Sequence, residues 1–260
     1  MSGAWTPEPF EADDGTAPFT LFIDELSDFK FVALDTAIDR VLSERGIDLV
    51  RTEWLKALGE GLHEFRVRHS AKEIAQMFGG DAVASETPRE AVLLRVFVHF
   101  YGAKVILLLG GYDKGDDPKP RRQQREITQA RKLLAQFKER QRRERRKRGG
   151  RRMGKSPYWC PGGQVMARSY RDIAEERRAR LAPRSAADRA VFEQAYDIAM
   201  QVVELREKHG LTQAQLAELS GIDQADISRI ERGSTSPTAR TLQRIADALG
   251  ADLRLVSRMS

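Results

Sequence analysis

Apolar residues change their spacing along the chain, and the change divides it into two parts. In the first 140 residues, strand-like runs alternate with helical spacing. The strand-like runs cover 62–69, 91–100 and 103–110. From residue 166 onward, apolar positions recur only at helical spacing. The pattern therefore predicts an α+β domain with a small antiparallel sheet and helices, followed by an all-α domain.

Shorter signals add detail to the first part. The run Phe19–Ile23 predicts a short strand, and apolar spacing over 34–42 predicts a helix that stops at Gly46. Leu49–Leu58 predicts a second helix, ended by two glycines. Only Tyr101 and Gly102 separate the two longest apolar runs, which favours a hairpin.

Three further segments have other compositions. Residues 70–90 and 110–120 are polar and contain glycine and proline, which predicts long loops. A helix with one apolar face is expected from Arg121 through Phe137. It leads directly into a strongly basic run.

Composition sets the segment boundaries. Residues 1–18 are acidic and rich in proline and glycine, which predicts a disordered tail. The other expected segments are an α+β domain at 19–140, a basic linker at 141–165, a helical segment at 166–196 and a second domain at 197–260.

Positive charge is concentrated in one place. The net charge is +6, and residues 140–155 alone carry ten basic side chains against one acidic side chain. The basic balance of the whole chain therefore does not by itself indicate a nucleic-acid partner. This run is either an arm that contacts nucleic-acid phosphates or simply part of the linker.

Several classes of protein are not favoured. Cys160 is the only cysteine, so no disulfide can form within the chain, as expected for a reducing, cytoplasmic setting. The four histidines are scattered without metal-ligand spacing, and no phosphate-binding glycine loop is present. The most apolar stretch, 91–109, carries Arg95, His99 and Lys104, so no membrane helix is expected. We expect no metal, no cofactor and no membrane association.

The strongest motif is the segment LTQAQLAELSGIDQADISRIERGSTSP, residues 211–237. Thr212 with Gln215 forms a capping-box pattern that begins a helix. Gly221 suits a tight turn, and Asp223 suits the start of a second helix. Two short helices around a glycine turn predict a helix–turn–helix, whose second helix presents its outer face.

This segment resembles the Cro/repressor-like, Xre-type DNA-binding family over about residues 198–250. In that family, the start of the second helix meets base edges in operator DNA. The resemblance implies that Gln224, Ala225, Asp226 and Arg229 contact bases and that Gln213 holds the phosphate backbone. Gln suits adenine, Arg suits guanine and Ala suits a thymine methyl, whereas Asp226 is less suited to lie beside phosphates. A homodimer would double the phosphate contacts of this modestly charged domain.

The first part carries a weaker motif. Its signature residues are Leu58, Gly59, Gly61, Leu62, Glu64, Arg66, Arg95 and Lys114. In this order they resemble the RelE/HigB toxin superfamily over about residues 20–140. The resemblance implies metal-independent cleavage of mRNA on the ribosome, in which cations stabilise charge on the phosphoryl oxygens. Arg66, Arg95 and Lys114 would supply those cations.

His99 lies four residues after Arg95 and is expected on the same strand face. Its ordinary pKa is near neutral, so it is a candidate general acid or base. Gly115 stands where many relatives have a second lysine, and Asp113, Asp116 and Asp117 surround Lys114. These carboxylates would oppose a polyanionic substrate.

Two interpretations remain open. The first is a toxin–antitoxin fusion, in which residues 166–196 clamp and neutralise the nuclease and the C-terminal domain represses its own operon. The alternative is a transcriptional regulator whose RelE-like domain is catalytically inactive. An artificial fusion of adjacent genes also remains open.

Overall fold

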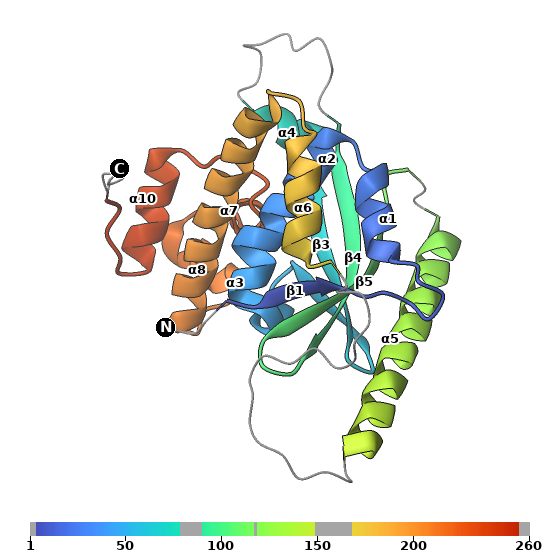
Figure 1. Ribbon diagram of the computed structural model, residues 1–260. Coiled ribbons are helices and arrows are strands. Elements are labelled where there is room, and N and C mark those ends of the chain that lie inside the picture. The colour runs from blue at the N-terminus through green and yellow to red at the C-terminus, as the bar shows by residue number, and fades with distance from the viewer. Residues whose placement is uncertain (1–3, 79–89, 117–118, 149–167, 255–260) are drawn as a thin grey trace.

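A mixed five-stranded sheet runs through the first half of the computed structural model (Figure 1). The structure describes residues 4–78, 90–116, 119–148 and 168–254. The strand order is β1-β5-β4-β3-β2. The strands are β1 (Thr6–Pro9), β2 (Leu55–Gly59), β3 (Leu62–His69), β4 (Val92–Tyr101) and β5 (Val105–Asp113).

Helices cover both faces of this sheet. One face carries the cluster that includes Phe65, Val96 and Leu108, and the other includes Leu62, Phe97 and Leu109. The first face is covered by α1 (Pro18–Glu25), α2 (Asp28–Ala37), the π-helical turn η1 (Ile38–Leu42), α3 (Ser43–Arg45), the 3-10 turn η2 (Gly46–Arg51) and α4 (Ala71–Met77), together with two later helices. The second face is covered by α5 (Pro120–Arg148).

The remaining helices are α6 (Tyr170–Ala179), α7 (Ser185–Lys208), α8 (Gln213–Ser220), α9 (Gln224–Glu231) and α10 (Ala239–Ala248). The first half of α7 packs on α2 and η1 through Phe192 and Tyr196. Its second half supplies Val202 to the separate core of α8, α9 and α10. The expected boundary at residue 196/197 therefore falls inside one continuous helix.

The expectation of a disordered tail at 1–18 is wrong for its central part, because Thr6–Pro9 forms β1. This strand is parallel to β5, so the sheet is mixed and not antiparallel as predicted. Thr6 and Phe10 donate backbone hydrogen bonds to Lys104 and Leu108. Pro7 and Pro9 lie between these donors on an edge strand, where a missing N–H leaves no hydrogen bond unmade.

Phe19–Ile23, predicted as a strand, lies in α1. Phe19, Phe22 and Ile23 are buried together, and this spacing is helical. Pro18 begins the helix, where its fixed φ is favourable. The run is too short for its apolar content to distinguish the two structures.

The helix predicted for 49–58 is also wrong, because this segment holds η2 and then β2. The two glycines expected to stop a helix instead form a hairpin with Glu60 between them. Gly59, Glu60 and Gly61 have φ of 88°, 55° and 80°, a left-handed run that glycine tolerates without strain. The turn sets β2 against β3.

The segment 110–120 is only partly a loop, because β5 continues to Asp113. A Cβ on Gly111 would lie 2.5 Å from the ring of Phe22 and 2.8 Å from the backbone oxygen of Arg95. The glycine therefore lets α1 approach the sheet closely. The expected loop at 70–90 contains α4, which starts with a capping box at Ser70, and its residues 79–89 lie outside the described part.

Other predictions are confirmed. The strand at 62–69 is β3, the two long apolar runs form the β4–β5 hairpin, and a helix covers 121–137 within α5. The prediction of a linker at 141–165 is wrong for 141–148, because the basic run continues α5 as far as Arg148. Residues 149–165 of the expected linker lie outside the described residues.

A buried carboxylate joins α6 and α7 to the first half of the chain. Asp35 of α2 is 1% exposed. It accepts hydrogen bonds from the Tyr170 hydroxyl at 2.7 Å, from Arg178 at 2.7 and 2.8 Å, and from Arg189 at 2.5 Å. Asp39, one turn later, pairs with the same two arginines at 3.0 and 2.7 Å. Burial and the adjacent Asp35 carboxylate raise the pKa of Tyr170 well above its ordinary value, so the phenol stays a donor.

Replacement of Asp35 by Ala should destabilise the whole chain. The change leaves two guanidinium groups and a buried hydroxyl without their main acceptor, at a cost of about 2–4 kcal/mol. Urea unfolding measures this cost. Asp24→Ala is the control, because Asp24 is half exposed and lies 4.0 Å from Arg180, so its loss should cost at most about 0.5 kcal/mol. Equal effects of the two changes would contradict the role assigned to Asp35.

Candidate nucleic-acid interface

The helices α8 and α9 form a compact unit with the second half of α7. Leu216, Ile227 and Ile230 are buried together with Val202. Thr212 and Gln215 form the predicted capping box, and Gly221 ends α8 with left-handed backbone geometry. Asp223 occupies the N-cap position of α9 as predicted, although its side chain makes no capping hydrogen bond.

A buried ion pair braces this unit from within. Arg206 of α7 donates to both carboxylate oxygens of Glu231, at 2.5 and 2.9 Å. Gln213 donates to the same carboxylate at 2.9 Å. Hydrogen bonding to Glu231 raises the pKa of Arg206 despite burial. Glu231 therefore stabilises the packing of α7, α8 and α9 from within.

The five residues predicted to meet DNA lie at the start of α8 and on α9. Gln224 and Ala225 are exposed at the first turn of α9. Arg229 lies one turn on, with 41% of its side chain exposed, and pairs with Asp226. The Asp226 carboxylate thus holds the Arg229 guanidinium beside the exposed side of α9. This pairing gives Asp226 a role at a position where a carboxylate was not expected. Gln213 is half-buried, and its amide nitrogen is already bound to Glu231.

The far end of α9 is fastened to the first half of the chain. Trp54 is buried, and its indole N–H donates to the backbone oxygen of Glu231 at 2.8 Å. Glu53 accepts from Ser228 at 2.6 Å and from Arg232 at 3.1 Å. Sequence patterns did not indicate this contact, because it joins residues that are about 175 positions apart.

Charge strengthens the Glu53 contact. Burial alone would raise the pKa of Glu53, but the hydrogen bond from Ser228 and the charges of Arg232 and Arg68 outweigh burial and lower it. A carboxylate whose pKa is lowered by folding stabilises the fold above its ordinary pKa. That contribution is lost as the pH falls through the lowered value.

The residues predicted for RNA cleavage lie on the sheet face covered by α5. Arg66 on β3 and Arg95 on β4 are directly paired in the strand register. Glu64, which is fully buried, lies between them, and its Oε2 atom is 2.7 Å from Arg66 and 3.9 Å from Arg95. Arg95 is only 6% exposed, and burial lowers its pKa. Two of the expected cations are therefore partly neutralised by a carboxylate.

Lys114 and His99 lie on opposite sides of the Arg66–Arg95 pair along the strands. Lys114 is beside the start of β4, and His99 is near its end. Lys114 follows β5 directly, and its backbone N–H donates to Leu93. Lys114 makes no ion pair within the described residues. The aspartates beside it are engaged elsewhere, since Lys30 lies 2.6 Å from Asp113 and 3.6 Å from Asp116. Lys30 therefore competes with Lys114 for these two carboxylates, which weakens the expectation that they oppose a polyanion, and Asp117 lies outside the described residues.

His99 is not brought to the arginines. Four residues of extended strand place it about 13 Å along β4 from Arg95. Its Nδ1 atom lies 2.8 Å from the backbone oxygen of Gly61, and its ring packs near Phe137. Burial lowers the pKa of His99. A general acid or base at this place would not reach a phosphate held between Arg66 and Arg95.

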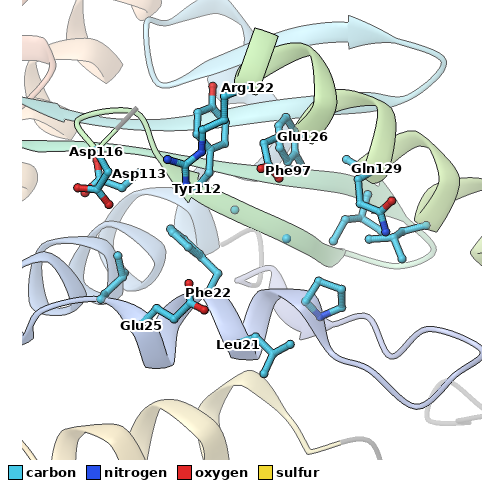
Figure 2. Close-up of a pocket in the computed structure, with 17 residues that line it drawn as sticks. Leu21, Phe22, Glu25, Phe97, Tyr112, Asp113, Asp116, Arg122, Glu126 and Gln129 are labelled. Carbon is cyan, nitrogen blue, oxygen red and sulfur yellow. The ribbon is translucent and has the colours of Figure 1, made fainter. Parts of the chain in front are cut away.

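A cavity of about 270 Å³ lies between α1 and α5 over the end of β5 (Figure 2). Phe22 and Glu25 line it from α1, and Arg122 and Glu126 line it from α5. Tyr112 lines the same cavity, and burial raises its pKa to about 12. The cavity does not include Arg66, Arg95 or Lys114 among its lining residues.

Neither metal binding nor a membrane span is indicated in the described part of the chain. No cluster of three or more histidine, cysteine, aspartate or glutamate side chains there has a geometry that would hold a metal ion. No described helix combines the length and apolar character that crossing a bilayer requires.

Comparison with known proteins finds a match to a family model in the C-terminal part of the chain. Residues 202–256 match the family described as Helix-turn-helix. An uncharacterized HTH-type transcriptional regulator from Haemophilus influenzae is 39% identical over 56 residues, which are 22% of this chain and 57% of the relative. Another from Sinorhizobium fredii is 46% identical over 46 residues, 18% of this chain and 60% of the relative. The matches thus span somewhat more than half the length of each relative, and no solved structure matches the chain.

Replacement of Glu53 by Ala should loosen the end of α9. The change removes a charged acceptor of Ser228 and Arg232 and should cost roughly 1–2 kcal/mol locally, because the site is partly open to solvent. Amide hydrogen exchange at 228–232 should become faster at neutral pH. In the unchanged chain, the same acceleration should appear only as the pH falls below the ordinary range of a glutamate. Glu60→Ala, on an exposed turn, should leave this exchange unchanged.

Proposed function

We propose that this protein is a DNA-binding transcriptional regulator that reads its operator with α9. The exposed first turn of α9, braced by the Arg206–Glu231 pair, is the observation that carries the proposal. The match of residues 202–256 to the Helix-turn-helix family supports it. The names of the two relatives, both HTH-type transcriptional regulators, are consistent with it.

Base reading is assigned to three side chains. Gln224 is suited to adenine through its amide, Arg229 to guanine through its guanidinium, and Ala225 to a thymine methyl. Asp226 orients Arg229 through their ion pair, and Gln213 is assigned to the phosphate backbone. A homodimer on an inverted repeat, with half-sites about one helical turn apart, would double these contacts.

The first half of the chain acts in this proposal as a fixed structural partner of the DNA-reading unit and is catalytically inactive. The partly neutralised arginines and the displaced His99 support this choice. The contacts of Trp54 and Glu53 hold the first half against α9, so it would accompany the DNA-reading unit on the operator.

Replacement of Arg229 by Ala should relax the preference for one base pair. A lost bidentate contact to guanine costs about 1–3 kcal/mol on the preferred sequence and little on others. Selection from a random duplex library, followed by competition binding, measures the change. Arg240→Ala is a control outside α9. Equal weakening on every sequence would show that Arg229 contacts only phosphates.

A second candidate is an RNA endonuclease that is neutralised within the same chain. The pairing of Arg66 with Arg95 across β3 and β4 favours it, as does the packing of α6 and α7 onto α2 and η1. These helices lie on the sheet face opposite to Arg66 and Arg95. In this candidate, they would act through the stability of the domain and would not cover its cations.

The two candidates differ in the expected result of an RNA cleavage assay. Full-length protein and a Glu64→Gln variant, which frees Arg66 from its buried carboxylate, would be incubated with translating ribosomes. We expect intact mRNA in both reactions, because the general acid or base is displaced. Cleavage that appears with Glu64→Gln and disappears when Arg66→Gln is added would instead establish the endonuclease. Glu25→Gln is the matched control, at an exposed position of α1 away from the arginines.

A further inference from the structure

The helix α5 carries far more positive charge than its neighbours. Its 29 residues include 13 Lys or Arg side chains and three Glu. The segment proposed to read DNA, residues 197–260, has eight basic and nine acidic side chains. The main positive surface of the molecule is therefore not on the helix–turn–helix.

Six basic side chains of α5 share one outward direction along the helix. Apolar residues at 130, 133, 134 and 137 bury the opposite side of the helix against the sheet. At 100° per residue, the outward direction is shared by one set of residues. This set, called the α5 stripe, is Arg121, Arg125, Lys132, Arg142, Arg143 and Arg146, and all of its members are exposed.

The stripe is nearly free of opposing charge. Glu139 is the one acidic residue that lies among it, and it pairs with Arg143 at 3.0 Å. Within the described residues, no ion pair involves Arg121, Arg125 or Lys132. A shallow groove lined by these three side chains and by Gln124 and Thr128 runs along the first turns of the helix.

Apart from the Glu139–Arg143 pair, the last turns of α5 have few stabilising contacts within the described residues. Phe137 is the final apolar contact, and Arg140 is tied to the body by Asp13 and the backbone of Glu11. Beyond Arg140, the helix extends away from the sheet (Figure 1). Like charges one turn apart repel, so a helix end of this composition is stabilised by a polyanion. The helix dipole favours cations at the C-terminus, but this effect stabilises basic residues only in the final turn of the helix.

We propose that the α5 stripe binds the phosphate backbone of duplex DNA without regard to base sequence. From Arg121 to Arg146, the stripe is about 38 Å long, which matches about eleven base pairs of backbone. The choice of duplex DNA over RNA rests on the proposed function, because a chain that reads an operator already works on duplex DNA.

The stripe and α9 cannot follow the same short stretch of DNA. The helix α5 covers one face of the sheet, whereas α9 is attached through α7 and Trp54 on the other side (Figure 1). The stripe therefore holds a second duplex segment, and one molecule bridges two segments. Such bridging raises the local DNA concentration for α9, whose own domain has little positive charge.

The salt dependence of binding tests the stripe directly. The stripe variant carries Arg121→Gln, Arg125→Gln, Lys132→Gln and Arg146→Gln. The control carries Arg51→Gln, Lys56→Gln, Lys72→Gln and Lys208→Gln, four exposed positions with the same change in net charge. Both are measured in full-length protein with Gln224→Ala and Arg229→Ala added, so that base reading is removed. The probe is a labelled duplex of about 20 base pairs with scrambled sequence, longer than the stripe.

We expect the stripe variant to have a shallower slope of log affinity against log salt, by about 3–4 for four lost phosphate contacts. The control should keep the original slope, and a variant with Arg121, Arg125 and Arg146 changed to Lys should also keep it. Energy transfer between two differently labelled duplexes should report bridging by the unchanged chain and its loss in the stripe variant.

Equal slopes in the stripe variant and the control would overturn the inference. Stronger binding of single-stranded RNA than of duplex DNA at the same nucleotide concentration would also overturn it. A failure of the proposed function has a different signature. In that case, library selection finds no preferred sequence and Arg229→Ala has no effect, while the slope still depends on the stripe.

Discussion

The structure depends on one buried carboxylate, that of Asp35. It collects a hydroxyl from α6 and guanidinium groups from α6 and α7 at a single point on α2. A charge this deeply buried is tolerated only when several donors surround it. The docking of α6 and α7 is therefore specific in angle and position and does not rest on apolar contact alone. Because α7 continues into the helix–turn–helix unit, the placement of α9 follows from the same point.

The two halves of the chain could not be predicted equally well. The capping box at Thr212, the glycine turn at Gly221 and the inward isoleucines are local signals, so the helix–turn–helix is evident from sequence. The parallel strand β1 depends on an edge left open about a hundred residues later, and no local pattern encodes it. Phe19–Ile23 illustrates the same limit, because five apolar residues satisfy both a strand and a buried helix.

The candidate sites show a similar division. Sequence indicated that Arg66 and Arg95 would lie near each other, and the strand register agrees. It did not indicate that Glu64 would be buried between them or that Lys30 would engage the aspartates beside Lys114. Whether an arginine is available to bind a phosphate depends on the carboxylates near it. Those neighbours are set by the tertiary structure and cannot be read from the local sequence. For this reason, the charge balance at the sheet favours a structural role, while α5 carries positive charge that has few acidic partners within the described residues.

The continuity of α7 has a geometric consequence. Its 24 residues contain no hinge between the part clamped by Asp35 and the part that carries Arg206. Each residue of an α-helix advances the chain by about 100° of rotation. One residue inserted near position 198 would thus rotate α9 by about a quarter-turn relative to the sheet and separate Ser228 from Glu53. The length of α7 therefore fixes the rotational position of α9, and with it the direction in which the exposed side of α9 faces relative to the sheet.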